Sequence, residues 1–92
     1  MWEVKKKKID KAFKKLPLSI KNSFDILVEE LKEFGPFRKS WPNYSKLRGR
    51  KDEFHCHLNK GKPRYVAYWI IIDKKIEITE VTYVGTHEKA PY

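Results

Sequence analysis

Three histidines stand at positions suited to proton transfer. The stretch DEFHCHLN at residues 52–59 carries His55 and His57, and the run VTYVGTHEKAPY at residues 81–92 carries His87. Alternate residues of an extended strand share a face, so His55 and His57 are expected to point the same way. Histidine takes and gives protons near neutral pH, which makes it a natural general acid or base. These residues predict proton-transfer chemistry if the fold brings His87 to the same face.

Basic side chains follow the histidine-bearing strand. The turn NKGKPR contains Lys60, Lys62 and Arg64, and a hairpin through this turn would place them beside the histidines. Cations stabilise the charge that develops on a phosphate during its displacement. A base that activates a ribose 2′-hydroxyl and an acid that protonates the leaving 5′-oxygen complete such a site. The set is therefore suited to cleavage of RNA.

The last residues of the sequence raise a separate question about Tyr92. We expect Gly85 to allow a sharp exit from the last strand, because glycine adopts backbone angles that other residues avoid. This exit would hold His87 near Arg64 on the adjacent strand. Tyr92 then either closes over the same site or packs to anchor the tail, and the sequence leaves both roles open.

A basic segment with interspersed aromatic residues precedes the stretch that carries His55 and His57. Residues 36–51, PFRKSWPNYSKLRGRK, mix Pro, Ser, Asn and Gly with aromatic and basic side chains. Arg and Lys bind phosphates and aromatic faces stack on bases, so the segment predicts RNA binding. For Trp41, packing of its ring against the core is an alternative of at least equal weight to RNA binding. The predicted RNA-binding residues are Arg48, Arg50, Lys51, Lys60, Lys62 and Trp41.

The pattern His55-Cys56-His57 raises the possibility of a metal site. Cys56 points to the face opposite the two histidines, and neither a CxxC pair nor a carboxylate stands at ligand spacing. We therefore expect no metal and no cofactor. Cys56 is expected to be a small buried hydrophobic residue.

The elements that must position these residues follow from the apolar pattern. A short strand around residues 2–5 is followed by a short helix that Asp10 is expected to cap, and Pro17 ends it. A longer helix carries Ile20, Phe24, Leu27, Leu31 and Phe34 on one face and ends at Gly35-Pro36. The two helices are expected to form an antiparallel hairpin.

Three strands are expected after the basic segment. Residues 52–59 alternate between apolar and polar positions, whereas residues 64–72, RYVAYWIII, are apolar on both faces, as in a central strand. Residues 76–85 begin with Ile76 and Ile78 inward and then change phase, which predicts a β-bulge near Thr79-Glu80. The sequence therefore predicts an α+β fold in the order β-α-α-β-β-β, with a helical hairpin on one face of a small, mainly antiparallel sheet.

Length and charge limit the class of protein. The 92 residues predict a single domain covering residues 1–92, and 40% hydrophobic residues are enough for a core. The formal net charge of +9 favours an anionic partner, either nucleic acid, an acidic protein or a membrane surface, although solubility alone is an alternative. One cysteine, no apolar run that could span a bilayer and no signal-peptide pattern predict a cytoplasmic protein.

Two long stretches resemble RelE/HigB-type toxins of bacterial and archaeal toxin–antitoxin pairs. They are RYVAYWIIIDKKIEITEVTYVGTHEKAPY, with its GTH…Y ending, and the upstream FDILVEELKEFGPFRKSWPNYSKL. The resemblance implies a microbial RNase-like fold and a ribosome-dependent mRNA endonuclease that represses translation. It also implies no metal, no small-molecule cofactor and no membrane. The implied partners are a cognate antitoxin protein and mRNA on the ribosome.

The resemblance also implies roles for individual residues. His87 matches the family's histidine after the last strand, and Arg64 matches its central-strand arginine. Lys60 and Lys62 occupy the family's basic turn, and His57 or its neighbour His55 matches a polar catalytic position. Tyr92 matches the family's terminal tyrosine at a longer spacing than usual.

Two other functions remain open from the sequence. ParE-like toxins of the same superfamily poison DNA gyrase through protein contact and have no nuclease chemistry, and the histidines argue against that branch. A generic basic RNA-binding module is the other alternative. A small acidic or helix-turn-helix reading frame beside the gene would favour either toxin over the RNA-binding module.

Overall fold

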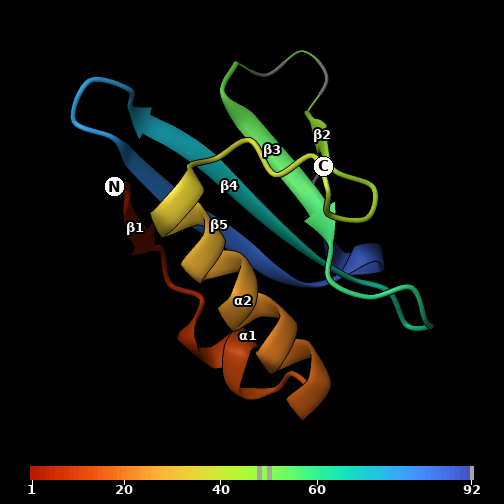
Figure 1. Ribbon diagram of the computed structural model, residues 1–92. Coiled ribbons are helices and arrows are strands. Elements are labelled where there is room, and N and C mark those ends of the chain that lie inside the picture. Colours follow the sequence, from red (N-terminus) through yellow and green to blue (C-terminus); the bar gives the residue numbers. More distant parts are fainter. Residues whose placement is uncertain (48, 50, 92) are drawn as a thin grey trace.

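The computed structural model describes residues 1–47, 49 and 51–91 of the chain. A five-stranded sheet carries one long helix across one face (Figure 1). The elements are β1 (Glu3–Lys6), α1 (Asp10–Lys14), α2 (Leu18–Phe34), β2 (Ser45–Lys46), β3 (Glu53–His57), β4 (Tyr65–Asp73), β5 (Ile78–Thr86) and the 3-10 turn η1 (His87–Lys89). None of the helices in these ranges has the length and apolar character needed to cross a membrane.

The sheet has the strand order β1-β5-β4-β3-β2. β1 runs parallel to β5, and every other neighbouring pair is antiparallel. The predicted α+β class, the mainly antiparallel sheet and the order of the main elements are confirmed. The two-residue strand β2 was not predicted. It pairs with β3 inside the basic segment, so that segment is in part a sheet edge.

Helix α2 forms because its apolar residues recur at helical spacing and face the sheet. Ile20, Phe24, Leu27 and Leu31 are buried, as predicted. Each such side chain contributes about 1.5–3 kcal/mol when it leaves water. The prediction that Phe34 faces the core is wrong: Phe34 is 60% exposed. It is the last residue of α2, where the chain leaves the core, and the guanidinium of Arg38 covers its ring instead, 5.3 Å from the centroid.

The end of α2 at Gly35 is fixed by two independent requirements. Gly35 has φ of 92°, in the left-handed region that favours glycine. A Cβ added there would lie 2.8 Å from Nε1 of Trp2. The backbone N–H of Trp2 also donates to the carbonyl of Lys32 at 2.8 Å. Gly35 therefore permits the start of the chain to pack against the last turn of α2.

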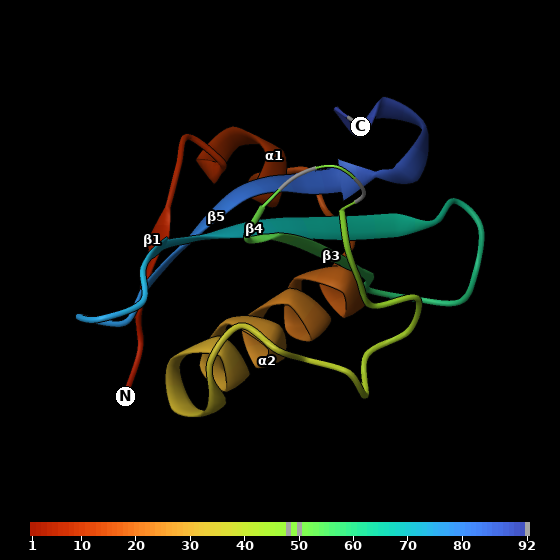
Figure 2. The ribbon, with the colours of Figure 1, turned by 90° about the horizontal axis from the view of Figure 1, so that it is seen from above.

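The first helix is shorter than predicted. α1 spans only Asp10–Lys14, contributes no fully buried residue, and begins at Asp10 without a side-chain cap. The prediction that Asp10 caps the helix is therefore wrong by one position, because Ile9 precedes the first turn. In Figure 2, α1 lies beside β5 and α2 lies across the sheet. The rings of Phe13 and Phe24, 5.7 Å apart, join the two helices.

Strands β3 and β4 have the predicted faces. Phe54, Cys56 and Leu58 are buried on the side of α2, while His55 and His57 alternate with them. β4 is buried on both faces from Val66 to Trp69, as expected for a central strand, but Ile72 near its end is 49% exposed. Trp69 is fully buried in the main core, and its indole N–H donates to the carbonyl of Pro36 at 2.9 Å.

The prediction for the start of β5 is wrong. Ile76 is 68% exposed and lies in the preceding turn. One carboxylate oxygen of Asp73 accepts hydrogen bonds from the backbone N–H groups of Lys75 and Ile76, at 2.8 and 3.1 Å. This side-chain acceptor extends the turn, so the strand begins two residues later than predicted, at Ile78.

The sequence predicted a bulge near Thr79-Glu80, and the pairing of β4 with β5 has two register shifts. One lies at the predicted place: Ile71 pairs with Thr79 and Asp73 with Ile78, so the extra residue, Ile72, is on β4.

The other shift lies farther along β5. Tyr68 pairs with Tyr83 while Trp69 pairs with Val81, so Thr82 is the extra residue on β5. Before the bulge Val81 faces the core, and after it Val84 does. The bulge thus keeps valines on the side of α2 and turns Tyr83 to the opposite face of the sheet.

The face opposite α2 is partly closed by a second, smaller apolar cluster. Leu47, Val66 and Tyr68 are buried there, and Tyr83 and Ala90 pack against them. The segment after β2 and the residues after η1 therefore cover part of this face. The rest carries the histidines.

Candidate functional site

Five aromatic rings follow one another across the face opposite α2. The ring centroids are 5.5 Å apart for His87 and His57, 6.1 Å for His57 and His55, 5.9 Å for His55 and Tyr68, and 5.5 Å for Tyr68 and Tyr83. The rings come from β3, β4, β5 and η1. The predicted convergence of the three histidines is present in the structure.

Strand β3 and its neighbour at the sheet edge hold His55 and His57. The backbone N–H of His57 donates to the carbonyl of Pro42 at 2.8 Å, which ties the loop after α2 to the end of β3. The hydroxyl oxygen of Ser45 on β2 lies 3.0 Å from Nδ1 of His55. The strand β2 therefore orients one imidazole from the side, and the alternation of β3 orients the other.

The connection between β5 and η1 places His87. The backbone N–H of His87 donates to the carbonyl of Arg64 at 2.8 Å, so the expected proximity to Arg64 is confirmed. The reason given for Gly85 was wrong, because Gly85 does not adopt the left-handed conformation. A Cβ at Gly85 would instead lie 2.7 Å from the hydroxyl oxygen of Tyr83. That hydroxyl donates to the carbonyl of Thr86 at 2.8 Å, and glycine leaves the room it needs.

The environment of His57 favours its neutral form. Burial lowers the pKa of His57, and the nearby His55, His87 and Arg64 lower it further. Burial also lowers the pKa of His55, an effect that its contact with the Ser45 backbone opposes. His57 is therefore unprotonated at neutral pH and able to accept a proton. His87 is exposed at the edge of the same cluster.

Two hollows flank the histidines and meet at Arg64. One has a volume of about 240 Å³ and is lined by Lys62, Pro63, Arg64, Thr86, His87 and Glu88. The other has a volume of about 270 Å³ and is lined by Pro42, Asn43, His57, Asn59, Lys60 and Arg64. Each hollow contains one of the two contacting histidines and one lysine of the basic turn. The arrangement suits an anion that lies between the two imidazoles.

Asn59 shapes the turn that carries these lysines. Its side-chain oxygen accepts a hydrogen bond from the backbone N–H of Tyr65 at 2.9 Å. Its amide nitrogen donates to the carbonyl of Pro63 at 3.1 Å. The turn is thus closed by a side chain, which holds Lys60, Lys62 and the start of β4 together.

Other predicted site residues lie elsewhere. The indole N–H of Trp41 donates to a carboxylate oxygen of Glu30 on α2 at 2.9 Å, and the ring packs against the main core. This placement agrees with the packing alternative. Lys51 is exposed in the turn before β3 and lines neither hollow. Arg48, Arg50 and Tyr92, also predicted as site residues, lie outside the described residues.

Several residues of the site were not foreseen. Tyr68 and Tyr83 continue the row of rings, Ser45 contacts the ring of His55, and Asn59 closes the basic turn. Alternation along β4 places Tyr68 on the same face as Val66, so the sequence indicated which face of the sheet Tyr68 lies on. The side-chain contacts of Ser45 and Asn59 depend on strand pairing and have no local signal.

Cys56 is fully buried, and burial raises the pKa of its thiol to about 12, with a further contribution from Glu30. The thiol is therefore protonated and unreactive, in agreement with its predicted role as a buried hydrophobic residue. Among residues 1–47, 49 and 51–91, no group of three or more His, Cys, Asp or Glu side chains is arranged to hold a metal ion.

The chain is similar in fold to a chain of a solved toxin–antitoxin complex. No protein-family model matches the sequence. No curated protein matches it either. A chain in the crystal structure of the archaeal RelE–RelB complex from Pyrococcus horikoshii OT3 superposes with a TM-score of 0.74 at 20% identity. The match covers 97% of this chain and 98% of that one. The RelE-type fold implied by the sequence resemblance is confirmed.

Proposed function

We propose that this chain is the toxin of a toxin–antitoxin pair and acts as a ribosome-dependent mRNA endonuclease, an mRNA interferase of the RelE/HigB type, that represses translation in the cytoplasm. The contact between His57 and His87 beside Arg64 carries the proposal. The fold supports it, because it is shared with a chain of an archaeal RelE–RelB complex.

The roles of the two histidines are assigned from their burial. Buried His57, whose pKa is lowered, takes the proton of a ribose 2′-hydroxyl, and the oxygen attacks the adjacent phosphorus. The bond from phosphorus to the 5′-oxygen breaks, and exposed His87, acting as the general acid, gives that oxygen a proton. The products are a 2′,3′-cyclic phosphate and a 5′-hydroxyl. The route requires no metal, oxidant or cofactor.

The cations supply the electrostatic part of catalysis. Arg64 lines both the hollow of His57 and that of His87, so we assign its guanidinium to the oxygens of a phosphate held there. Lys60 and Lys62, one in each hollow, are placed to contact the neighbouring phosphates of the strand. Stabilisation of developing charge by such groups is usually the largest single contribution to rate.

A cognate antitoxin is the proposed protein partner. The net charge of +9 and the lysine-lined hollows favour an acidic segment that covers the site. Such a segment is disordered when alone and folds on docking. The partner in the archaeal complex of similar fold is RelB.

A translation system reconstituted with purified ribosomes and a defined mRNA tests the proposal. We expect the protein to cut mRNA on translating ribosomes, and His87→Ala to cut about 10²–10⁴-fold more slowly. The exposed position of His87 predicts that this variant keeps the parent's melting temperature. A protein that leaves mRNA intact but inhibits DNA gyrase would support the ParE-like alternative. Binding of RNA without cleavage would support the RNA-binding module.

A further inference from the structure

A third hollow lies between α1 and the second half of β5. It has a volume of about 400 Å³, within the range of about 300–1,000 Å³ that is typical of ligand sites. β1 pairs only with Ile78–Val81 of β5, so in the described ranges no strand covers the remainder of that edge. The lining residues are Ala12, Lys15, Leu16, Tyr65, Tyr83, Val84, Gly85, Thr86 and Lys89.

The lining combines aromatic rings with cations. Tyr65 and Tyr83 are half-buried, while Lys15 and Lys89 are exposed, and none of the lining residues is acidic. No ion pair in the described part of the chain involves either lysine. The ring of Tyr83 is fixed by its hydrogen bond to Thr86 and by the room that Gly85 leaves. Aromatic faces flanked by free cations are the groups that bind single-stranded nucleic acid.

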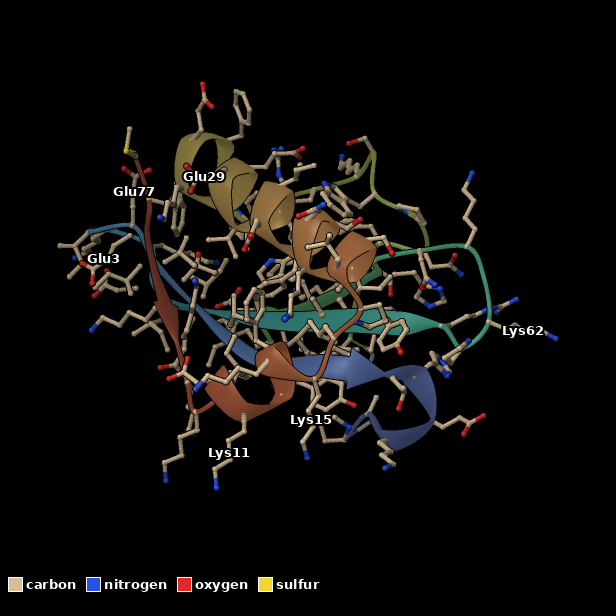
Figure 3. All side chains as sticks on the ribbon, turned by 90° about the horizontal axis from the view of Figure 1, so that it is seen from below. Glu3, Lys11, Lys15, Glu29, Lys62 and Glu77 are labelled. Carbon is tan, nitrogen blue, oxygen red and sulfur yellow. The ribbon has the colours of Figure 1, made fainter. Side chains whose placement is uncertain are left out.

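This hollow continues the surface of the histidine site. Thr86 lines both this hollow and the one that contains His87. Lys89 belongs to the same 3-10 turn as His87. In Figure 3, η1 lies between Lys15 on α1 and Lys62 on the basic turn. A single strand of nucleic acid that runs from the histidines over the end of β5 therefore reaches this third hollow directly.

We infer that this hollow is a subsite for one base of a single-stranded RNA whose scissile phosphate lies between His57 and His87. The base stacks on Tyr83, and its flanking phosphates contact Lys15 and Lys89. The inference rests on the proposed function, since it takes RNA as the substrate. The inference adds the path that the RNA strand takes beyond the reacting phosphate.

The geometry favours RNA over an acidic peptide at this position. An extended peptide would add to the sheet by pairing with the free edge of β5. The carbonyl of Thr86 already accepts a hydrogen bond from the hydroxyl of Tyr83, which takes up one of its two acceptor positions at this edge. The ring of Tyr83 is an apolar face that every base can stack on.

The experiment measures how affinity depends on the length of the RNA. The probes are a short oligonucleotide with 2′-O-methyl ribose at the scissile position, which cannot be cut, and longer ones extended at the 5′ or the 3′ side. We expect one extension to raise the affinity of the parent protein. Lys15→Ala with Lys89→Ala should remove that gain and lower the slope of log affinity against log salt by about 1.4, since each phosphate contact contributes about 0.7.

Matched variants separate the subsite from general charge effects. Lys5→Ala with Lys75→Ala removes the same charge from exposed positions outside all three hollows and should keep the gain. Tyr83→Leu should lower the affinity of the longer RNA about tenfold, whereas Tyr83→Phe keeps the ring and most of the affinity.

Each outcome decides between the two proposals. If neither extension raises affinity, or the control pair removes the gain equally, the subsite is wrong while ribosome-dependent cleavage can still stand. If Lys15→Ala with Lys89→Ala abolishes binding of a Glu-rich peptide but keeps the RNA gain, the occupant is a peptide and the inference fails. If even the short RNA does not bind and mRNA on ribosomes is intact, both proposals fail.

Discussion

Replacing His57 and His87 singly and together tests whether the two rings act on one phosphate. His57 is only 6% exposed, so His57→Gln, which keeps a polar side chain of similar size, is the suitable change. His87 is exposed, so His87→Ala removes the imidazole without leaving a cavity. The variants are His57→Gln, His87→Ala and the double replacement.

The contact between the rings sets the expected size of the effect. Loss of one general acid or base costs about 10²–10⁴ in rate. If the two residues acted in separate steps or sites, the double variant would lose the product, about 10⁴–10⁸. Ring centroids 5.5 Å apart put both imidazoles within reach of one phosphate, so we expect bond formation and bond breaking to be coupled. The double variant is therefore expected within about tenfold of the slower single variant.

The assay is single-turnover cleavage of mRNA on translating ribosomes, with melting and binding of uncleavable RNA as controls. The rate of the parent should fall on the acid side with a midpoint below the ordinary histidine value of about 6.5, because the lowered pKa of His57 keeps it neutral to lower pH. His57→Gln should remove this limb of the profile. Multiplicative losses in the double variant, or an unchanged acid limb in His57→Gln, would refute the paired role.

Two further predictions concern stability. The pKa of His57 is lower in the folded chain than in the unfolded chain, so the unfolded chain binds more protons between the two values. The free energy of unfolding should therefore fall as pH drops below about 7.5, and less steeply in His57→Gln, as urea titrations at each pH would show; equal slopes would contradict this. Gly85→Ala displaces the Tyr83 hydroxyl, 2.7 Å from the added Cβ, and should cost about 0.5–1.5 kcal/mol for the lost hydrogen bond. The cost should be smaller in a Tyr83→Phe background, and an equal cost in both backgrounds would show that the hydroxyl is not the obstacle.

Local periodicity was sufficient where one element decides its own burial. The spacing of Phe24, Leu27 and Leu31 predicted the buried face of α2, and the alternation of residues 52–59 predicted which face carries the histidines. In both cases the apolar side chains can be buried only on the side that faces the core. The prediction failed for Phe34 because a helix can extend past the core, and periodicity does not show where the core ends.

The details that failed depend on contacts between elements. The start of β5 depends on the carboxylate of Asp73, which accepts two backbone hydrogen bonds and lengthens the turn. The bulge at Thr82 depends on the register with β4, and the phase change in sequence indicated only the shift near Thr79. The need for glycine at position 85 comes from the Tyr83 side chain, which glycine's backbone freedom alone did not indicate.

Part of the site was predictable for the same reason. His55 and His57 share a face by alternation, and His87 reaches them because β5 pairs with β4 as a hairpin. Tyr68 lies in an apolar central strand, where a tyrosine is naturally interpreted as core. Trp41 lay in a basic segment and was open to both interpretations until its hydrogen bond to Glu30 placed it against α2.

The register of β3 against β4 determines both the packing of the core and the position of the histidines. On β3, Phe54 and Cys56 face α2 while His55 and His57 face the other way, and Phe54 pairs with Trp69, whose ring centroid is 6.3 Å away. A slip of one residue would turn both histidines into the main core and expose the apolar residues. Burying imidazoles without partners is costly, so the slipped pairing is excluded by the core itself. The packing of Phe54 and Trp69 under α2 therefore fixes where the histidines stand, although neither residue lies on the face that we propose to cleave RNA.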